Sequence, residues 1–466
     1  MPCGPFTSIP PHLPAVHHTS NLVLEMSANS PLGPVPKNLP HAPTEVLRDL
    51  RRHMQIRHAA LKAAGVKLNI ARGKPCTEQV SLADQLLMAV GPENCVAEED
   101  TDCRNYYGSP QGLIEARRLF APILGAPPEQ VLVGNNSSLA LMHDAVVFSL
   151  LKGVGEGAAP WRRNREPVLF LCPSPGYDRH FAICEQYDIR MVPIRLTGHG
   201  PDMDEVERLV ADPQVKGMWC VPTYSNPTGD TYSAETVERL ARMAAADDFR
   251  LFWDNAYAVH HLTEEPDELE NILEACARAG NPDRTLVFSS TSKISFAQGG
   301  LGLFASSPAN VAWFVRCLSF RTIGPDKLNQ LRHVRVFRDA KGIARHMKRH
   351  KEIIAPKFEA VLAVFRERLE DTCAARWSEP RGGYFISLDA YPGCAKRIAE
   401  LARDCGVEVV PAGRTFPYGL DPEDSNLRIA PTFPAIEEVR QAAEALSACT
   451  LLALTEKLLR DRGVKD

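Results

Sequence analysis

Residues 285–293, Thr-Leu-Val-Phe-Ser-Ser-Thr-Ser-Lys, carry an apolar, strand-forming segment directly into a lysine. Two other strand-like runs, residues 217–221 and 250–253, precede it, and stretches with helical spacing lie among these runs. Strands that alternate with helices are typical of parallel pairing in a sheet whose faces are covered by helices. We therefore predict the α/β class, with a mostly parallel central sheet.

The same pattern extends over the middle of the chain and changes towards its ends. Ser233 is placed to cap a helix that starts at residue 234. The other elements that we expect are strands over residues 168–172, 302–305, 384–388 and 407–411, and helices over about 43–61 and 234–246, after 325 and from about 435.

These patterns divide the chain into four segments. Residues 1–40 are rich in Pro, Ser and His, lack apolar periodicity and predict a flexible tail. We expect residues 105–325 to form a large, cofactor-binding domain around the sheet. Residues 41–104 and 326–466 are expected to build a smaller α+β domain from the N- and C-terminal segments.

Composition excludes several classes of function. The chain has 466 residues, 44% of them apolar and 24% charged, with a net charge of −4. It has no apolar run of about 18 residues, which a membrane span needs, and no dense Lys/Arg tract for nucleic acid. We therefore expect no membrane and no nucleic-acid partner. The start of the chain resembles neither a secretion signal nor an organelle transit peptide, so the cytoplasm is the expected compartment.

The 13 cysteines are scattered without a CxxC pair or close Cys/His spacing. Such usage is typical of reduced, buried thiols rather than of a disulfide framework or a zinc site. The pairs His17-His18 and His260-His261 are potential metal ligands, but adjacent side chains usually point apart. We expect no metal.

Lys293 is the residue around which candidate chemistry gathers. A lysine amine forms a Schiff base with an aldehyde cofactor only when it is deprotonated and well placed. Ser290 and Ser292 flank it as possible hydroxyl donors to a phosphate. Taken alone, the motif also describes a surface lysine after a strand.

Two upstream motifs, Asn226-Pro-Thr-Gly229 and Asp254-Asn-Ala-Tyr257, fit the same chemistry. Asp254 follows a strand, where a carboxylate can keep a pyridine nitrogen protonated and make the ring an electron sink. A buried Asp254 would need a cationic partner; the alternative is a turn or helix-cap residue. Tyr257 and Asn226 can donate to the phenolic oxygen of the ring, although Asn-Pro-Thr-Gly is also an ordinary turn sequence.

A phosphate site is expected at Gly134-Asn-Asn-Ser-Ser138, between a strand and a helix. The first N–H groups of a helix bind anions, and Asn135, Asn136 and Ser137 add polar side chains. The motif is weak, because any strand-to-helix turn favours these residues.

Tyr177 and Arg428 complete the set of candidates. Tyr177 follows another strand and either stacks on the cofactor ring or packs in the core. Arg428 lies in the apolar sequence Leu-Arg-Ile-Ala-Pro, and arginine grips carboxylates with two parallel bonds. An exposed ion pair is the alternative for Arg428.

In this order the motifs resemble the pyridoxal-phosphate enzymes of fold type I, the aspartate aminotransferase superfamily, over about residues 45–460. The resemblance implies that Lys293 is the Schiff-base lysine and Asp254 the partner of the pyridine nitrogen. It implies that Tyr257 and Asn226 are the donors to the phenolate. Arg428 would bind the α-carboxylate of the substrate.

The resemblance also extends to the N-terminal third. Tyr107 matches the tyrosine that reaches the phosphate of the neighbouring subunit, which implies a homodimer with shared active sites. Gly73 matches the glycine that lets a mobile segment approach the substrate. The motifs Ala71-Arg-Gly-Lys-Pro75, Arg104-Asn-Tyr106 and Arg321-Thr-Ile-Gly-Pro-Asp-Lys327 look like the divergent bacterial branch of aspartate aminotransferases called subgroup Ic.

One position departs from the family pattern. Most relatives carry a phosphate-binding arginine eight residues after the lysine, where this chain has Leu301. Either neutral donors bind the phosphate or another cation replaces that arginine. Arg321 is the candidate for binding the distal carboxylate of a dicarboxylic substrate.

We therefore expect a pyridoxal-phosphate-dependent aminotransferase, with aspartate and 2-oxoglutarate as the favoured amino acid and 2-oxo acid. Another reaction on the same cofactor, β-elimination or decarboxylation, is the alternative, because the motifs do not specify which bond breaks. A sensor that binds the cofactor without turnover is a further alternative. Residues 1–40 are too short and proline-rich for the DNA-binding domain that such regulators carry.

Overall fold

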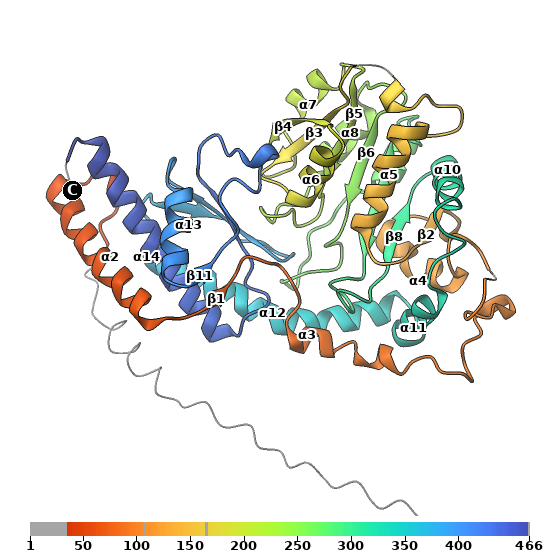
Figure 1. Cartoon of the computed structure of the whole chain (residues 1–466), viewed down its shortest axis with the longest axis horizontal. Helices are drawn as coiled ribbons and strands as arrows, with labels where there is room; N and C mark the ends of the chain where they lie inside the picture. The colour runs from red at the N-terminus through yellow and green to blue at the C-terminus, as the bar shows by residue number, and fades with distance from the viewer. Residues whose placement is uncertain (1–34, 107, 164–165, 465–466) are drawn as a thin grey trace, which may run out of the picture.

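A seven-stranded sheet forms the centre of the molecule, and a smaller layer of helices and strands lies beside it (Figure 1). The computed structural model describes residues 35–106, 108–163 and 166–464. The strands are β1 (Leu68–Asn69), β2 (Val131–Val133), β3 (Leu169–Ser174), β4 (Arg190–Arg195), β5 (Val215–Cys220), β6 (Arg250–Asp254), β7 (Thr285–Ser290), β8 (Gly302–Ala305), β9 (Ala375–Trp377), β10 (Ile386–Ala390), β11 (Val407–Glu408) and β12 (Asn426–Ile429). The α-helices are α2 (Thr44–Ala64), α3 (Thr77–Ser81), α4 (Ile114–Leu124), α5 (Ser138–Lys152), α6 (Asp178–Gln186), α7 (Met203–Leu209), α8 (Ala234–Arg242), α9 (Ile272–Arg278), α10 (Pro308–Leu318), α11 (Lys327–Phe337), α12 (Ala340–Leu369), α13 (Ala395–Asp404) and α14 (Ile436–Asp461).

The strand order of the central sheet is β2-β8-β7-β6-β5-β3-β4. All its strands run parallel except β8, which is antiparallel to both of its neighbours. Residues 291–301, between β7 and β8, contain no helix, and a parallel connection needs a crossover of a dozen or more residues. The short connection therefore explains why β8 runs the other way.

Helices cover both faces of this sheet because its strands are apolar on both sides. In β6, Leu251 and Trp253 join the core under α4, α7, α8 and α9, whereas Phe252 joins the core under α5, α6 and α10. Successive strand residues point to opposite faces. An apolar run such as Leu-Phe-Trp therefore needs helices on both faces of the sheet. The predicted α/β class with a mostly parallel, helix-covered sheet is confirmed.

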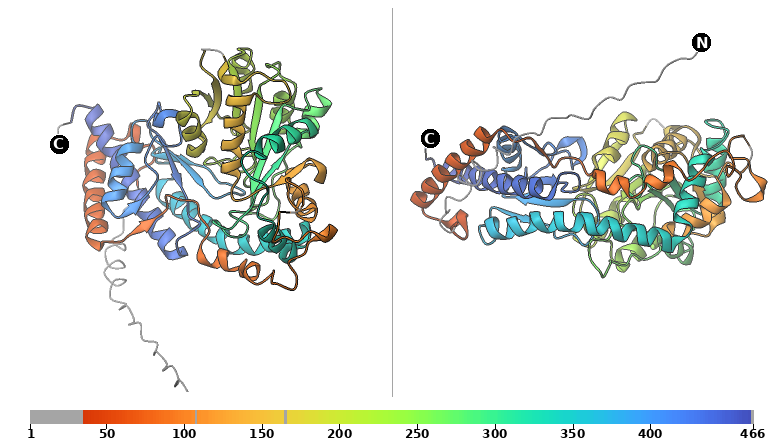
Figure 2. Two further views of the ribbon diagram at one scale, coloured as in Figure 1. Left: turned by 45° about the vertical axis from the view of Figure 1, so that its right-hand side comes forward. Right: turned by 90° about the horizontal axis from the view of Figure 1, so that it is seen from below.

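The chain ends share a second core, which lies beside the central sheet in both views of Figure 2. β1 pairs with β11, and β12, β10 and β9 form an antiparallel sheet against α2, α13 and α14. The long helix α12 joins the two cores: Ile343 and Met347 pack in the first and Phe358 and Phe365 in the second. The predicted boundaries at residues 104/105 and 325/326 stay predictions.

The described residues just before position 41, the end of the predicted tail, pack against the rest of the chain. Leu39 is fully buried, and its N–H donates to the carbonyl of Thr372. Residues 1–34, which include His17 and His18, lie outside the described residues. Among the residues that are described, no helix has both the length and the apolar character of a membrane span.

Several elements were missed by the sequence patterns. β4 is an edge strand that contains Pro193 and two exposed arginines, so its composition does not indicate a strand. β9 and β12 are short. Cysteine spacing in the sequence also did not reveal which potential metal ligands lie together. His58, Cys405 and Cys449 place their ligand atoms within 4.8 Å of one another although they are distant in sequence.

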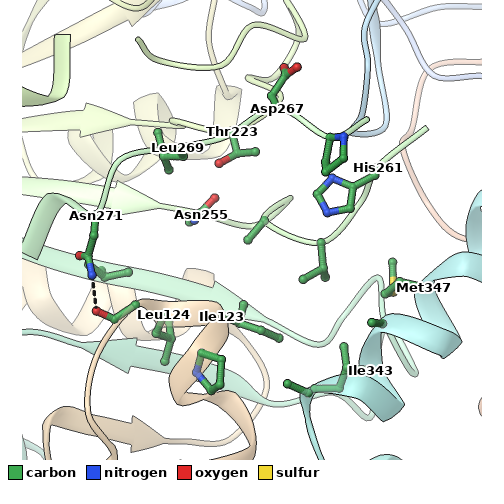
Figure 3. A pocket seen from close by; sticks show the side chains of 18 of the residues that line it. Ile123, Leu124, Thr223, Asn255, His261, Asp267, Leu269, Asn271, Ile343 and Met347 are labelled. Carbon is green, nitrogen blue, oxygen red and sulfur yellow. Dashed lines mark hydrogen bonds between the residues drawn. The ribbon is translucent and has the colours of Figure 1, made fainter. Parts of the chain in front are cut away.

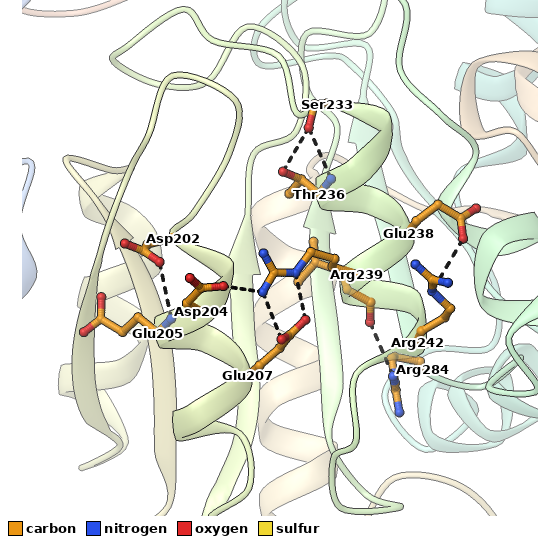
Figure 4. Close-up of polar contacts among 11 residues, drawn as sticks. Asp202, Asp204, Glu205, Glu207, Ser233, Thr236, Glu238, Arg239, Arg242 and Arg284 are labelled. Carbon is orange, nitrogen blue, oxygen red and sulfur yellow. Dashed lines mark hydrogen bonds and ion pairs between the residues drawn. The ribbon is translucent and has the colours of Figure 1, made fainter.

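Ser233 caps α8 as predicted, although the helix ends earlier than residue 246 (Figure 4). Its Oγ accepts from the N–H of Thr236 at 3.2 Å. At the other end, the Arg284 guanidinium donates to the carbonyls of Ala241 (3.0 Å) and Met243 (2.7 Å), and so satisfies groups that the end of the helix leaves free.

We expect Ser233→Ala to destabilise α8 by about 1 kcal/mol, because the first-turn N–H groups lose their acceptor. Hydrogen exchange of the Thr236 amide should then become about fivefold faster. Ser233→Asp is the matched control, since aspartate keeps an acceptor and should leave exchange nearly unchanged. Equal exchange in the alanine variant and the parent protein would show that the cap does not hold the helix.

Candidate active site

The candidate residues of the central domain meet at one edge of its sheet. Asn226, Asp254 and Lys293 follow or end β5, β6 and β7, and Tyr177 follows β3. These strands are parallel, so their carboxyl ends lie on the same edge, where ligands collect in such sheets. The predicted placement of the motifs at strand ends is therefore observed.

The Lys293 amine lies among aromatic rings. Its Nζ is 5.1 Å from the ring centroid of Tyr257 and 5.8 Å from that of Tyr384. Burial lowers the pKa of this amine, the nearby Asp254 carboxylate raises it, and the Arg428 guanidinium lowers it. Because the net direction is downward, the neutral, nucleophilic form is favoured relative to an exposed lysine.

Asp254 is buried with one oxygen paired and one free. Its Oδ2 lies 3.0 Å from Nε2 of His180, and the His180 ring stacks on Trp219 at a centroid distance of 4.3 Å. Its Oδ1 is buried and has no hydrogen-bond partner among the described residues. A buried carboxylate oxygen without a donor is costly, so this atom is suited to accept an N–H from a bound molecule.

Arg428 reaches the site from β12, in the small antiparallel sheet. Its Nη1 donates to Oδ1 of Asn226 and to Oδ1 of Asp178, both at 3.3 Å. Its Nε is buried and has no hydrogen-bond partner in the part of the chain that the structure describes, and the guanidinium lies 4.8 Å from the centroid of the Phe385 ring. Arg428 is thus a buried cation, which rules out the exposed ion pair considered above.

Gly73 packs against the same aromatic ring. A Cβ at this position would lie 2.5 Å from Cζ of Phe385, which is closer than a real side-chain contact. The segment that carries Gly73 can therefore approach Phe385, and with it Arg428, only because the residue is glycine.

Tyr257 and Tyr177 lie beside these charged groups. Burial raises the pKa of the Tyr257 hydroxyl well above its usual value and that of Tyr177 to about 12, and in both cases the Asp254 charge adds to the effect. Both hydroxyls are therefore protonated donors at neutral pH. The Tyr177 ring also packs edge-on against His180, with a centroid distance of 4.9 Å.

The turn before α5 joins the loop of Lys293. The Asn136 amide donates to the carbonyls of Ala297 and Gln298, both at 3.1 Å, and its oxygen accepts from Ser292 at 3.2 Å. Asn135 accepts from the N–H of Asp326 at 2.8 Å. These asparagine side chains hold the loops together, whereas Ser137, at the N-cap of α5, makes no side-chain capping bond.

The remaining predicted residues have different settings. Leu301 is fully buried in the core, and Ser290 is buried at the end of β7. Arg321 is not bonded to the group around Lys293; its Nε pairs with Asp144 of α5 at 3.2 Å. Tyr107 lies outside the described residues.

Sequence reasoning did not assign four residues that contact this site. His180 is the hydrogen-bond partner of Asp254, and its helical spacing from Tyr177 was the available signal. Asp178, which binds Arg428, gave no signal. Tyr384 and Gln79 meet through a 2.9 Å hydrogen bond between distant segments, which local patterns do not reveal.

Comparisons with known proteins agree with this geometry. The family model for aspartate amino-transferase matches residues 43–462. A Mycolicibacterium smegmatis protein named as an aminotransferase is 53% identical over 414 residues, which cover 88% of this chain and 96% of that protein. The aspartate aminotransferase of Corynebacterium glutamicum is 46% identical over 397 residues, which cover 85% of this chain and 91% of that protein.

A solved structure supports the same family assignment. The crystal structure of an aspartate transaminase from Corynebacterium glutamicum superposes with a TM-score of 0.88 at 44% identity, covering 90% of this chain and 99% of that one. The fold and site thus define an aminotransferase of fold type I. The chain belongs to the aspartate aminotransferase family. Its assignment to subgroup Ic stays a prediction.

We expect His180→Ala to destabilise the protein by about 1.5–3 kcal/mol at neutral pH, because it removes a hydrogen bond to a buried carboxylate. Urea unfolding of the cofactor-free protein would measure the loss. His180→Gln is the matched control, since its amide can still donate to Asp254 and should recover part of the stability. Equal stability of both variants and the parent would mean that the bond contributes nothing.

Proposed function

We propose that this protein is a pyridoxal-phosphate-dependent aminotransferase that moves an amino group between an amino acid and a 2-oxo acid. The observation that carries the proposal is the convergence of an amine, a carboxylate and a guanidinium: Lys293, Asp254 and Arg428. The charges of Asp254 and Arg428 both shift the pKa of Lys293. The three residues come from different strands or loops of two sheets. A nucleophilic amine, a ring-nitrogen partner and a carboxylate clamp are the groups that transamination requires.

The donor set fits the cofactor. When bound, pyridoxal phosphate supplies an electron sink for the electron pair left on the substrate Cα after its proton leaves. Asp254 Oδ1, which is otherwise unpartnered, would accept the N–H of the pyridinium ring. Tyr257 and Asn226 would donate to the phenolic oxygen, and Tyr177 would stack on the ring.

The phosphate would lie at the N-terminus of α5, where helix N–H groups favour anions. Ser137, Ser290 and Ser292 would add hydroxyl donors, and the Asn135–Asn136 turn would set the loop. With Leu301 in the position of the usual arginine, these groups are neutral. We therefore propose that neutral donors and the helix terminus bind most of the phosphate charge.

The roles of the chain in the reaction follow from charge and position. Because the pKa of Lys293 is lowered, its neutral amine would take the proton from the substrate Cα and hold it for return later in the reaction. Arg428 would bind the α-carboxylate, and Asn226 would help to orient both groups. Gly73 allows the N-terminal segment to lie close over the substrate and exclude water.

Aspartate and 2-oxoglutarate are the favoured substrates. Support comes from the sequence and the solved structure named as aspartate aminotransferase or transaminase from Corynebacterium glutamicum. The role of Arg321 as the ligand of the distal carboxylate stays a prediction; in a single chain it pairs with Asp144. We also propose a cytoplasmic homodimer, in which Tyr107 would reach the phosphate of the second subunit.

The alternatives are less well supported. β-Elimination and decarboxylation need the same cofactor and carboxylate clamp, so the site alone does not exclude them. The relatives at 46% and 44% identity are named as transaminases, which favours transamination. The same names favour a catalyst over a sensor that binds the cofactor without turnover.

We expect Lys293→Ala to reduce aspartate–2-oxoglutarate transamination by at least about 10³-fold, because the variant lacks the group that moves the Cα proton. The visible absorbance of cofactor bound to the lysine should also disappear. Lys341→Ala, at an exposed site on α12, is the control and should retain both properties. An active Lys293→Ala enzyme would refute the central assignment.

We expect Arg428→Lys to raise the KM for aspartate by about tenfold or more, because a point charge replaces a bidentate fork. Steady-state kinetics over a series of amino donors would measure the effect and identify the preferred donor. Arg440→Lys, on the exposed face of α14, is the control for charge-preserving substitution. An unchanged KM would remove Arg428 from substrate binding.

A further inference from the structure

A cavity of about 610 Å³ lies across the sheet from the Asp254–His180 pair (Figure 3). Trp253 lines it, and Trp253 points to the opposite face of β6 from its neighbour Asp254. The end of α4, the loop that follows β6 and the first turns of α12 close the other sides. None of Lys293, Asp254 or Arg428 lines this cavity, so it is separate from the site described above.

Two buried oxygens on its wall have no partner. Thr223 is only 3% exposed, and its Oγ1 makes no hydrogen bond with the described residues. Oδ1 of Asn255, on the same wall, is also buried and unpaired. Figure 3 shows both side chains on the strand side of the cavity. An unpaired buried polar group is unfavourable, so a ligand that hydrogen-bonds both oxygens would remove this cost.

The opposite wall is apolar, and Lys348 lies in a charged rim that also carries Glu264, Asp267 and Glu270. Ile343 and Met347 face the cavity from successive turns of α12, and Ile123 and Leu124 come from the end of α4. Lys348, on the same helix, also lines the cavity and makes no hydrogen bond or ion pair with any residue that the structure describes. The neighbouring Lys351 differs, because it pairs with Glu264 at 2.6 Å.

We propose that this cavity is a second small-molecule site that binds a hydroxylated aromatic carboxylic acid. A neutral hydroxyl both donates and accepts, so it can bond Asn255 Oδ1 and Thr223 Oγ1 without burying a charge. An aromatic ring fills the space between Met347 and the sheet. The carboxylate then meets Lys348 at the rim. The volume lies in the range of ordinary ligand pockets, roughly 300–1,000 Å³.

The test is calorimetric titration of the holoenzyme with 4-hydroxyphenylacetate. Saturable binding at one equivalent per chain is expected, and phenylacetate, which lacks the hydroxyl, should bind about tenfold more weakly or worse. Binding should persist when maleate, a dicarboxylate without an amine, saturates the catalytic site. Loss of binding in the presence of maleate would place the ligand in the catalytic site and overturn the proposal.

Variants locate the site independently of activity. Thr223→Val and Lys348→Gln should each weaken binding by about fivefold or more, whereas Arg345→Gln, at an exposed position on α12 outside the cavity, should not. Met347→Trp should fill the cavity and abolish binding while the visible absorbance of the bound cofactor is retained. Absence of binding to the parent enzyme, or equal binding to Thr223→Val and the parent, would refute the site.

Discussion

Mutual compensation of buried charge is the constraint on which the site depends. Asp254, Lys293 and Arg428 are removed from water together, and an isolated buried ion would be far too costly. His180 bonds one oxygen of Asp254, while Asn226 and Asp178 accept from Arg428. The amine of Lys293 has no hydrogen-bond partner among the described residues, and burial lowers its pKa. Burial therefore favours the neutral form of this amine.

This arrangement also ties the two cores together. Arg428 belongs to the small antiparallel sheet, but its hydrogen bonds are to residues that follow β3 and β5 of the central sheet. Phe385, next to β10, lies between Arg428 and Gly73. A shift of the smaller core against the larger would move the proposed carboxylate clamp relative to Lys293. In the proposed role of Arg428, substrate binding would therefore depend on the relative position of the two cores.

The strands that carry the site have a second role on their other face. Asp254 faces His180, whereas Trp253 and Asn255 line the cavity across the sheet. Alternation along one strand thus places neighbouring residues at two different sites. A ligand in the cavity would contact the residue that follows Asp254, which gives the two sites a direct covalent connection through the backbone of β6.

Local sequence determined the α/β class, most strands of the central sheet, the Ser233 cap and the set of residues at strand ends, because periodicity and turn chemistry are short-range properties. It also indicated that a buried Asp254 needs a cation. Only the tertiary structure showed that His180 hydrogen-bonds this carboxylate and that Asp178 pairs with Arg428. It also showed that Arg284 bonds the last carbonyls of α8 and that a cavity lies beside Thr223. Each of these contacts joins residues distant in sequence, and their partners are selected by how the strands and helices pack, which no local pattern specifies.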